Sequence, residues 1–144
     1  MKPGPDVTAV GDENVPVPPR VLGLAAGRRL RLAWRNELGG LTFEIGEGDD
    51  RRMVKWSPRT SPIDLDAERA RLAWAGAYVT VPVVLDHGSD PDATWFVTRA
   101  LPGENAVSPR WVAAPATAVA AIGAGLRAFH DALPVDGCPF SWSV

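Results

Sequence analysis

In two segments near the start of the chain, apolar and polar positions alternate, which is typical of strands that bury one face. The residues expected on the buried face are Leu30, Leu32, Trp34, Leu41, Phe43 and Ile45. Between these segments, "NELGG" (residues 36–40) has the glycines of a hairpin turn. A second turn, "EGDD", leads into "RRMVKW" (51–56). We therefore predict three antiparallel strands joined as a meander.

A helical pattern follows the third strand. Ser61 is expected to cap the helix, Pro62 suits its first position, and Asp64 adds negative charge to the first turn. The helix is predicted to run to about Tyr78. Two more strands are predicted in "PVVLDHG" and "TWFVTRA", a short helix in "PPRVLGLAAG" before the first strand, and a long helix from Pro115 onwards.

This order of elements predicts the fold class. Three strands, a helix and two strands differ from the alternation of a parallel doubly wound sheet. We predict an α+β fold, a five-stranded antiparallel sheet with one packed helix, similar to the small lobe of the protein-kinase-like fold. The long helix after it would be the first helix of the large lobe.

Composition narrows the class of protein. The chain has 144 residues, of which 46% are hydrophobic and 22% charged, as in a globular domain. A net charge of −2 gives no reason to expect a nucleic acid or an anionic membrane as partner. Residues 1–17 read as a mobile leader without the apolar core of a signal peptide. The single cysteine, Cys138, allows no internal disulfide and fits a cytoplasmic protein.

Lys55 is one of only two lysines, and it lies in the third predicted strand. Met53 should share its face, whereas Val54 and Trp56 should point to the other. A kinase-like lobe needs a cation on this strand to reach the nucleotide phosphates. Lysine suits this role because one ammonium on a long stem can contact phosphate oxygens and a carboxylate together, unlike the planar arginine fork.

Glu68 is the candidate carboxylate partner. Leu65, Glu68 and Leu72 have the i, i+3, i+7 spacing of one helix face, which should pack on the sheet. A glutamate among core-facing leucines needs a counter-charge, and Lys55 is the natural one. In the alternative, Glu68 pairs with Arg71 at the surface and Lys55 extends to water. Spacing alone leaves both alternatives open.

Four motifs carry a family resemblance. They are "WRNELGGLTFEIG", "VKWSP", "TWFVTRALPGENAVSPRW" and "LRAFHDALPVDGCPFSW". From about residue 30 to the C-terminus, the chain resembles aminoglycoside phosphotransferases of the 3′-phosphotransferase branch. The resemblance implies a kinase-like fold in which ATP, with Mg²⁺, donates a phosphoryl group to an antibiotic hydroxyl.

The resemblance also assigns site residues. Lys55 would contact the α- and β-phosphates, Glu68 would hold Lys55, and the turn with Gly39 and Gly40 would cover the phosphates. This turn lacks the GxGxxG of protein kinases, as is typical of the family.

The segment "VTRALPG" resembles the family's hinge. The backbone of Thr98 and Ala100 would read the adenine edge. Met53 stands where relatives often carry an aromatic residue that stacks on adenine, and its soft apolar side chain could pack there instead.

The catalytic part of the family pattern is missing. The sequence contains no His-Gly-Asp loop with a downstream Asn. We therefore expect no catalytic residue and no metal ligand in this portion, and expect the magnesium ligands and the antibiotic-binding acidic residues beyond residue 144. His87, His130 and Cys138 lack metal-ligand spacing. His87 is expected in a turn after a strand, His130 to cap or pack, and Cys138 to be a small packed side chain.

The long helix supports a truncated large lobe. Its apolar stripe consists of Val119, Ile122, Leu126, Phe129 and Leu133, and the remaining positions are mostly alanine and glycine. Such a helix needs neighbours on several sides, so self-association through it is expected. The predicted divisions are 1–29, leader and short helix; 30–104, kinase-like N-terminal lobe; and 105–144, truncated start of the C-terminal lobe.

Two functional interpretations follow. In the first, the chain is the nucleotide-binding portion of an ATP-dependent aminoglycoside phosphotransferase, a resistance enzyme, and is inactive alone. In the second, it is a catalytically inactive nucleotide-binding remnant of a kinase-like protein. A His-Gly-Asp motif encoded downstream of Val144 would distinguish them.

Overall fold

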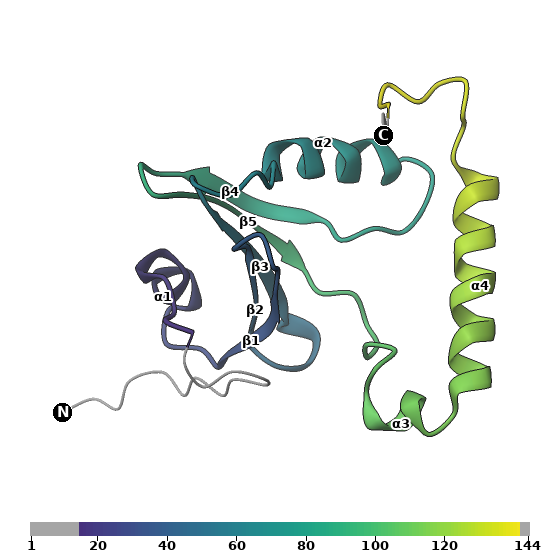
Figure 1. Ribbon diagram of the computed structural model, residues 1–144, viewed down its shortest axis with the longest axis horizontal. Coiled ribbons are helices and arrows are strands. Elements are labelled where there is room, and N and C mark those ends of the chain that lie inside the picture. Colours follow the sequence, from purple (N-terminus) through teal and green to yellow (C-terminus); the bar gives the residue numbers. More distant parts are fainter. Residues whose placement is uncertain (1–14, 142–144) are drawn as a thin grey trace.

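The computed structural model describes residues 15–141, and Figure 1 shows their arrangement. A five-stranded sheet has the order β1-β2-β3-β5-β4, and all its neighbouring strands are antiparallel. The predicted α+β fold is confirmed. The elements are α1 (Pro19–Ala25), β1 (Leu30–Arg35), β2 (Leu41–Ile45), the 3₁₀ turn η1 (Gly48–Asp50), β3 (Arg52–Pro58), α2 (Leu65–Ala75), β4 (Val84–Ser89), β5 (Ala93–Arg99), α3 (Pro109–Val112) and α4 (Pro115–Ala132).

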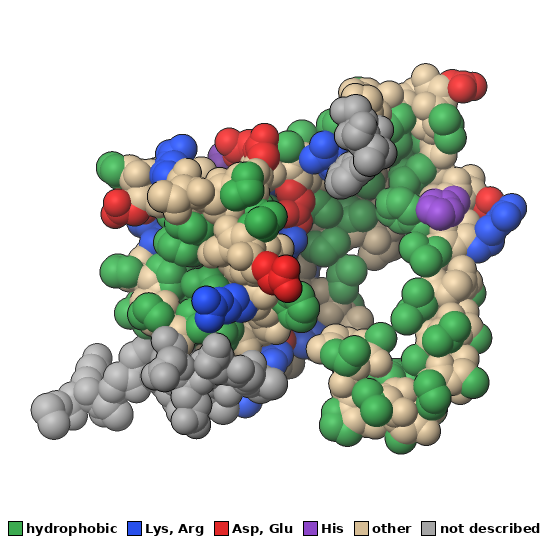
Figure 2. Space-filling view, viewed as in Figure 1, with side chains coloured by type: hydrophobic (Ala, Val, Ile, Leu, Met, Phe, Trp, Pro, Cys, Tyr) green, Lys and Arg blue, Asp and Glu red, His purple; other side chains and the backbone are tan. Residues whose placement is uncertain are grey.

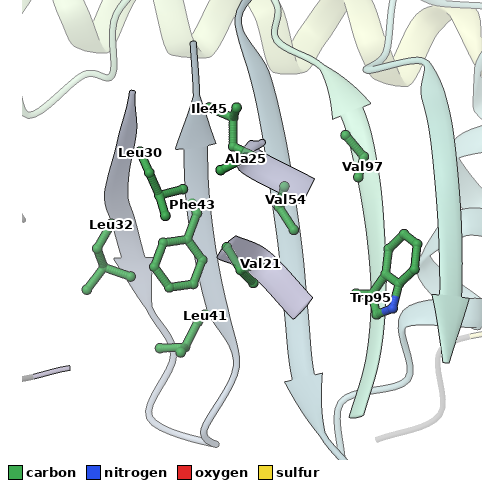
Figure 3. Close-up of a cluster of buried hydrophobic side chains, with 10 residues drawn as sticks. All are labelled: Val21, Ala25, Leu30, Leu32, Leu41, Phe43, Ile45, Val54, Trp95 and Val97. Atoms are coloured by element: carbon green, nitrogen blue, oxygen red, sulfur yellow. The ribbon is translucent and has the colours of Figure 1, made fainter. Parts of the chain in front are cut away.

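The main core lies between α1 and one face of the sheet. Figure 3 shows Val21 and Ala25 of α1 among the apolar side chains of the strands. The alternation predicted for β2 is confirmed, because its burial follows strict period two. The strand residues of this core are Leu30, Leu32, Leu41, Phe43, Ile45, Val54, Trp95 and Val97.

The placement predicted for Trp34 is wrong. The register of β1 on β2 shifts between Leu32 and Trp34, so that Leu32 lies opposite Phe43 and Trp34 lies opposite Thr42. Ala33 is the extra residue of this β-bulge, and one extra residue reverses the face of every later side chain. Trp34 is consequently 67% exposed on the polar face of β2 rather than buried beside Leu32.

The predicted start of α2 is also wrong. Asp64, not Ser61, is its N-cap, and the Asp64 carboxylate accepts a hydrogen bond of 2.9 Å from the Ala67 N–H. The Ser61 hydroxyl instead accepts from the Ile63 N–H at 3.2 Å, which makes a turn before the helix. The helix ends at Ala75, three residues before the expected Tyr78, and continues as turns.

Two short connections hold the sheet edges in place. In the β1–β2 hairpin the Asn36 N–H donates to the Gly40 carbonyl at 2.8 Å, and Gly39 has a positive φ of 94° that glycine adopts without strain. In the β4–β5 hairpin Asp90 accepts from the backbone N–H groups of Asp92 and Ala93 at 3.0 and 2.9 Å. Each of the five strands of the sheet begins and ends within two residues of the segment predicted for it.

After β5 the chain leaves the sheet. It forms α3, which was not predicted, and then α4, which stands apart from the sheet in Figure 1. No residue of α4 is buried, and apolar side chains gather along α3 and α4 in Figure 2. The end of the described chain returns to α2, where the Phe140 ring lies 5.8 Å from that of Trp74. No helix among residues 15–141 is long and apolar enough to cross a membrane.

Candidate functional site

Lys55 and Glu68 meet across the space between β3 and α2. The Lys55 ammonium donates a hydrogen bond to Oε1 of Glu68. Arg71, the alternative partner, places its guanidinium 5.4 Å from the Phe140 ring. Glu68 therefore pairs with Lys55, as in the first alternative, and not with Arg71 at the surface.

The pair is only partly buried. The side chains of Lys55 and Glu68 are 41% and 34% exposed. Ion pairs whose side chains are this exposed to solvent contribute at most about 1 kcal/mol to the free energy of folding. The pair therefore adds little to folding, and among the described residues only Glu68 accepts a hydrogen bond from the Lys55 ammonium.

A pocket of about 380 Å³ opens beside this pair. The β1–β2 hairpin lies on one side of it, and Ile63, just before α2, and Leu65, at the start of α2, lie on the other. The lining residues are Trp34, Asn36, Gly40, Leu41, Thr42, Lys55, Trp56, Ser57, Ile63, Leu65 and Glu68.

Gly40 lets the β1–β2 hairpin approach the segment before α2. A Cβ at this position would lie 2.7 Å from Cδ1 of Ile63, in the segment before α2. A glycine therefore allows the hairpin to approach α2 without displacing Ile63. Gly39, the other predicted glycine, is exposed at the turn and does not line the pocket.

Met53 and Thr98 lie one step along the sheet from Lys55. They are opposite each other in β3 and β5, on the face that also carries Lys55 and Phe96. Thr98 is 4% exposed. Neither Met53, which was expected to pack on adenine, nor Thr98, whose backbone was expected to read its edge, lines the pocket beside Lys55.

Ala100 follows the end of β5. Its N–H donates to the Arg51 carbonyl at 3.0 Å and so extends the β3–β5 ladder by one residue. The Arg51 guanidinium in turn donates to the Leu101 carbonyl at 3.0 Å and to the Glu44 carboxylate at 3.1 Å. These bonds tie the segment after β5 to the start of β3. An adenine read by the Ala100 N–H would replace its bond to Arg51.

Trp34 and Ser57 are among the pocket residues that the sequence analysis did not assign to the site. Trp34 lines the pocket because of the bulge at Ala33, which leaves no trace in the alternation. Ser57 is 1% exposed and lies on the Lys55 face, and its hydroxyl has no hydrogen-bond partner among the described residues. Its even spacing from Met53 and Lys55 was the available signal.

Within residues 15–141, no three His, Cys, Asp or Glu side chains gather as metal ligands would. His130 lies in α4 with its ring 6.3 Å from that of Phe129. His87 is exposed and lies in β4, opposite Phe96, rather than in a turn after the strand. Cys138 is exposed rather than packed as expected.

Known proteins that are similar to this chain in sequence are phosphotransferases. The model of a family described as "Phosphotransferase enzyme family" matches residues 35–143. An aminoglycoside 3′-phosphotransferase of Streptomyces ribosidificus is 40% identical over 107 residues, which are 71% of this chain and 40% of the relative. One of Streptomyces fradiae is 40% identical over 85 residues, 58% of this chain and 31% of the relative.

A streptomycin 3″-kinase of Streptomyces griseus is 38% identical over 107 residues, 72% of this chain and 37% of the relative. The chain thus spans between 31% and 40% of the length of these three relatives. Because the family match covers most of the chain and includes both Lys55 and Glu68, the chain belongs to the phosphotransferase enzyme family.

Proposed function

We propose that this chain binds ATP and is the nucleotide-binding portion of an aminoglycoside phosphotransferase of the 3′ type. The observation that carries the proposal is the Lys55–Glu68 ion pair beside the pocket under the β1–β2 hairpin. The names of the relatives support an aminoglycoside as acceptor. ATP as the phosphoryl donor is consistent with the cytoplasmic location expected from the single cysteine.

Each residue has a proposed role. The Lys55 ammonium binds the α- and β-phosphates, and Glu68 keeps it from extending into water. The hairpin with Gly39 and Gly40 covers the phosphates and excludes water from them. Adenine would lie toward Met53 and Thr98, with backbone groups of Thr98 and Ala100 at its edge.

Magnesium would neutralise charge on the transferred phosphoryl group. Mg²⁺ in such sites is usually bound by one or two carboxylates together with the nucleotide phosphates, and the family resemblance puts these carboxylates in motifs that this sequence lacks. We propose that its ligands lie outside the 144 residues, together with the group that accepts the hydroxyl proton. The sequence has no His-Gly-Asp motif, so the 144 residues alone should not phosphorylate an antibiotic.

Residues 105–144 are proposed to be the start of a C-terminal lobe. Side chains on α4 support this, because Val119, Ile122, Leu126 and Phe129 remain 40% to 68% exposed. Residues 30–104 would form the N-terminal lobe, and residues 1–29 the leader and short helix. The first 14 residues lie outside the part that the structure describes.

Calorimetry with ATP tests the proposal. The purified chain should bind ATP, and kanamycin should cause no ADP production with it. A longer protein with this chain at its N-terminus and a His-Gly-Asp motif downstream should produce ADP when kanamycin is added. An inactive remnant, the second candidate, would bind ATP but have no such motif encoded downstream. Failure of the chain to bind ATP would refute both candidates.

A further inference from the structure

The bulge in β1 places a large aromatic side chain in the site. Trp34 is turned away from the core that its sequence position suggests and reaches the pocket beside Lys55. β-bulges next to active sites commonly redirect one side chain. An indole that stays 67% exposed also forgoes most of the free energy of burial, so a ligand that covers it would recover part of that free energy.

The strand register shows which part of a nucleotide Trp34 could approach. Trp34 lies opposite Thr42, and Thr42 lies opposite Lys55. Trp34 is therefore in the cross-strand row of Lys55, about 10 Å from it across two strand spacings. Met53 and Thr98, toward which adenine is proposed to lie, occupy the next row. Trp34 is thus beside the phosphate end of the pocket and not beside the base.

The chemistry of this position favours a cation. An indole face attracts ammonium groups and packs against apolar faces of ring compounds. Glu37 follows in the hairpin, exposed and without an ion pair to any described residue. Arg35 lies opposite Leu41 and so belongs to the other face of the strand.

We infer that Trp34 contacts the acceptor and helps to select a cationic amino sugar. The inference rests on the proposed function and adds a residue that the family resemblance does not assign. Trp34 would not take part in chemistry. It would hold an aminated ring of the acceptor against the open end of the phosphate site.

The test uses the complete 144-residue chain labelled with ¹⁵N. The chain has six tryptophans, and the Trp34→Phe variant identifies the indole signal of Trp34. AMP-PNP is added first, then kanamycin, with the uncharged sugar trehalose in a parallel sample. Kanamycin should shift the Trp34 signal, whereas trehalose should not.

Variants supply the affinity test. Trp34→Ala should weaken kanamycin binding about tenfold, within the range of a partly desolvated cation–π contact, and Trp34→Phe should restore most of it. Trp111→Ala is the matched control, because Trp111 lies on α3 with its ring 4.4 Å from the Arg110 guanidinium, outside the pocket. It should leave kanamycin binding unchanged. Circular dichroism verifies that each variant is folded.

Three outcomes would overturn the inference. They are equal kanamycin affinity in Trp34→Ala and wild type, a Trp34 signal that responds to AMP-PNP but not to kanamycin, and no kanamycin binding by the wild type even at about 10 mM, where a contact made without the acidic residues expected beyond residue 144 is still detectable. The last result would indicate that the bulge only disrupts pairing at an edge strand. AMP-PNP binding that is lost in Lys55→Ala tests the proposed function separately, so failure of either can be recognised.

Discussion

Lys55 in β3 and Glu68 in α2 are 13 residues apart in the sequence and form an ion pair at the edge of a pocket. Both side chains keep a third or more of their surface in solvent. An exposed pair of this kind adds little to stability, yet it holds the ammonium in one direction. Removing either partner should therefore affect ligand binding more than folding.

Lys55→Ala should lower ATP affinity at least tenfold, because a hydrogen bond to a charged group contributes roughly 1.5–3 kcal/mol. The free energy of unfolding should change by less than about 1 kcal/mol. Calorimetry and urea unfolding measure the two quantities. Arg69→Ala is the matched control, since Arg69 pairs with Asp66 at 2.8 Å on the same helix, and ATP affinity should not change. Equal ATP affinity in Lys55→Ala would remove Lys55 from the site.

The parts of this site that follow a regular period could be predicted from the sequence. The spacing of Leu65, Glu68 and Leu72 put Glu68 on the sheet side of α2, and alternation put Lys55 on the face opposite Val54. The bulge at Ala33 could not be predicted, because "RLAWRN" alternates equally well without it. An inserted residue moves every later side chain of the strand to the other face, so the alternation predicted the wrong face for Trp34.

The start of α2 shows a different limit. Ser61 and Asp64 are both good caps, and Pro62 suits the first helical turn after Ser61. Local preference does not decide between them. In the structure Ser61 closes a turn with Ile63, and the helix begins after Asp64. Ile63, in the segment before the helix, lies close to Gly40 of the hairpin.

Gly88→Ala should destabilise the sheet by about 1–3 kcal/mol, as overpacking does. Gly88 lies opposite Trp95, and a Cβ there would be 2.5 Å from Cζ2 of the indole. The ring is rigid and 9% exposed, so it cannot move aside easily. Urea unfolding measures the change. Gly123→Ala is the matched control, because a Cβ on this residue of α4 meets nothing within 4 Å, and it should not destabilise. Equal stability of both variants would contradict the packing described here.

Asp90 should make stability depend on acidic pH. Hydrogen bonds from the backbone N–H groups of Asp92 and Ala93, and the nearby charge of Arg20, lower the pKa of this carboxyl below its usual value. A lowered folded-state pKa contributes stability that is present above the unfolded-state pKa. It is lost as the pH falls through the folded-state value, here below about pH 4.

Asp90→Asn keeps an acceptor oxygen but cannot ionise. Wild type should be more stable than this variant at pH 7, and the difference should shrink as the pH falls below about 4. Thermal unfolding between pH 2 and pH 7, roughly the range over which carboxyls titrate, measures it. Asp49→Asn, in the η1 turn, controls for the loss of one carboxylate. A constant difference between wild type and Asp90→Asn across this range would exclude the linkage.

The exposed stripe of α4 should cause the chain to self-associate. Val119, Ile122, Leu126 and Phe129 recur at helical spacing and are 68%, 49%, 54% and 40% exposed. Two copies that pair along this stripe would remove it from water, with about 25 cal/mol gained for each Å² of apolar surface buried. Sedimentation velocity should show a mean mass that rises with protein concentration.

A charged double variant tests this surface directly. Ile122→Glu with Leu126→Glu should give a monomer at every concentration, because pairing would bury four carboxylates in each dimer. The matched control is Arg127→Gln, which breaks the 2.9 Å pair with Asp131 on the same helix and leaves the stripe intact. It should associate like wild type. If wild type were monomeric at all concentrations, or if the double variant associated equally well, α4 would not be the contact surface.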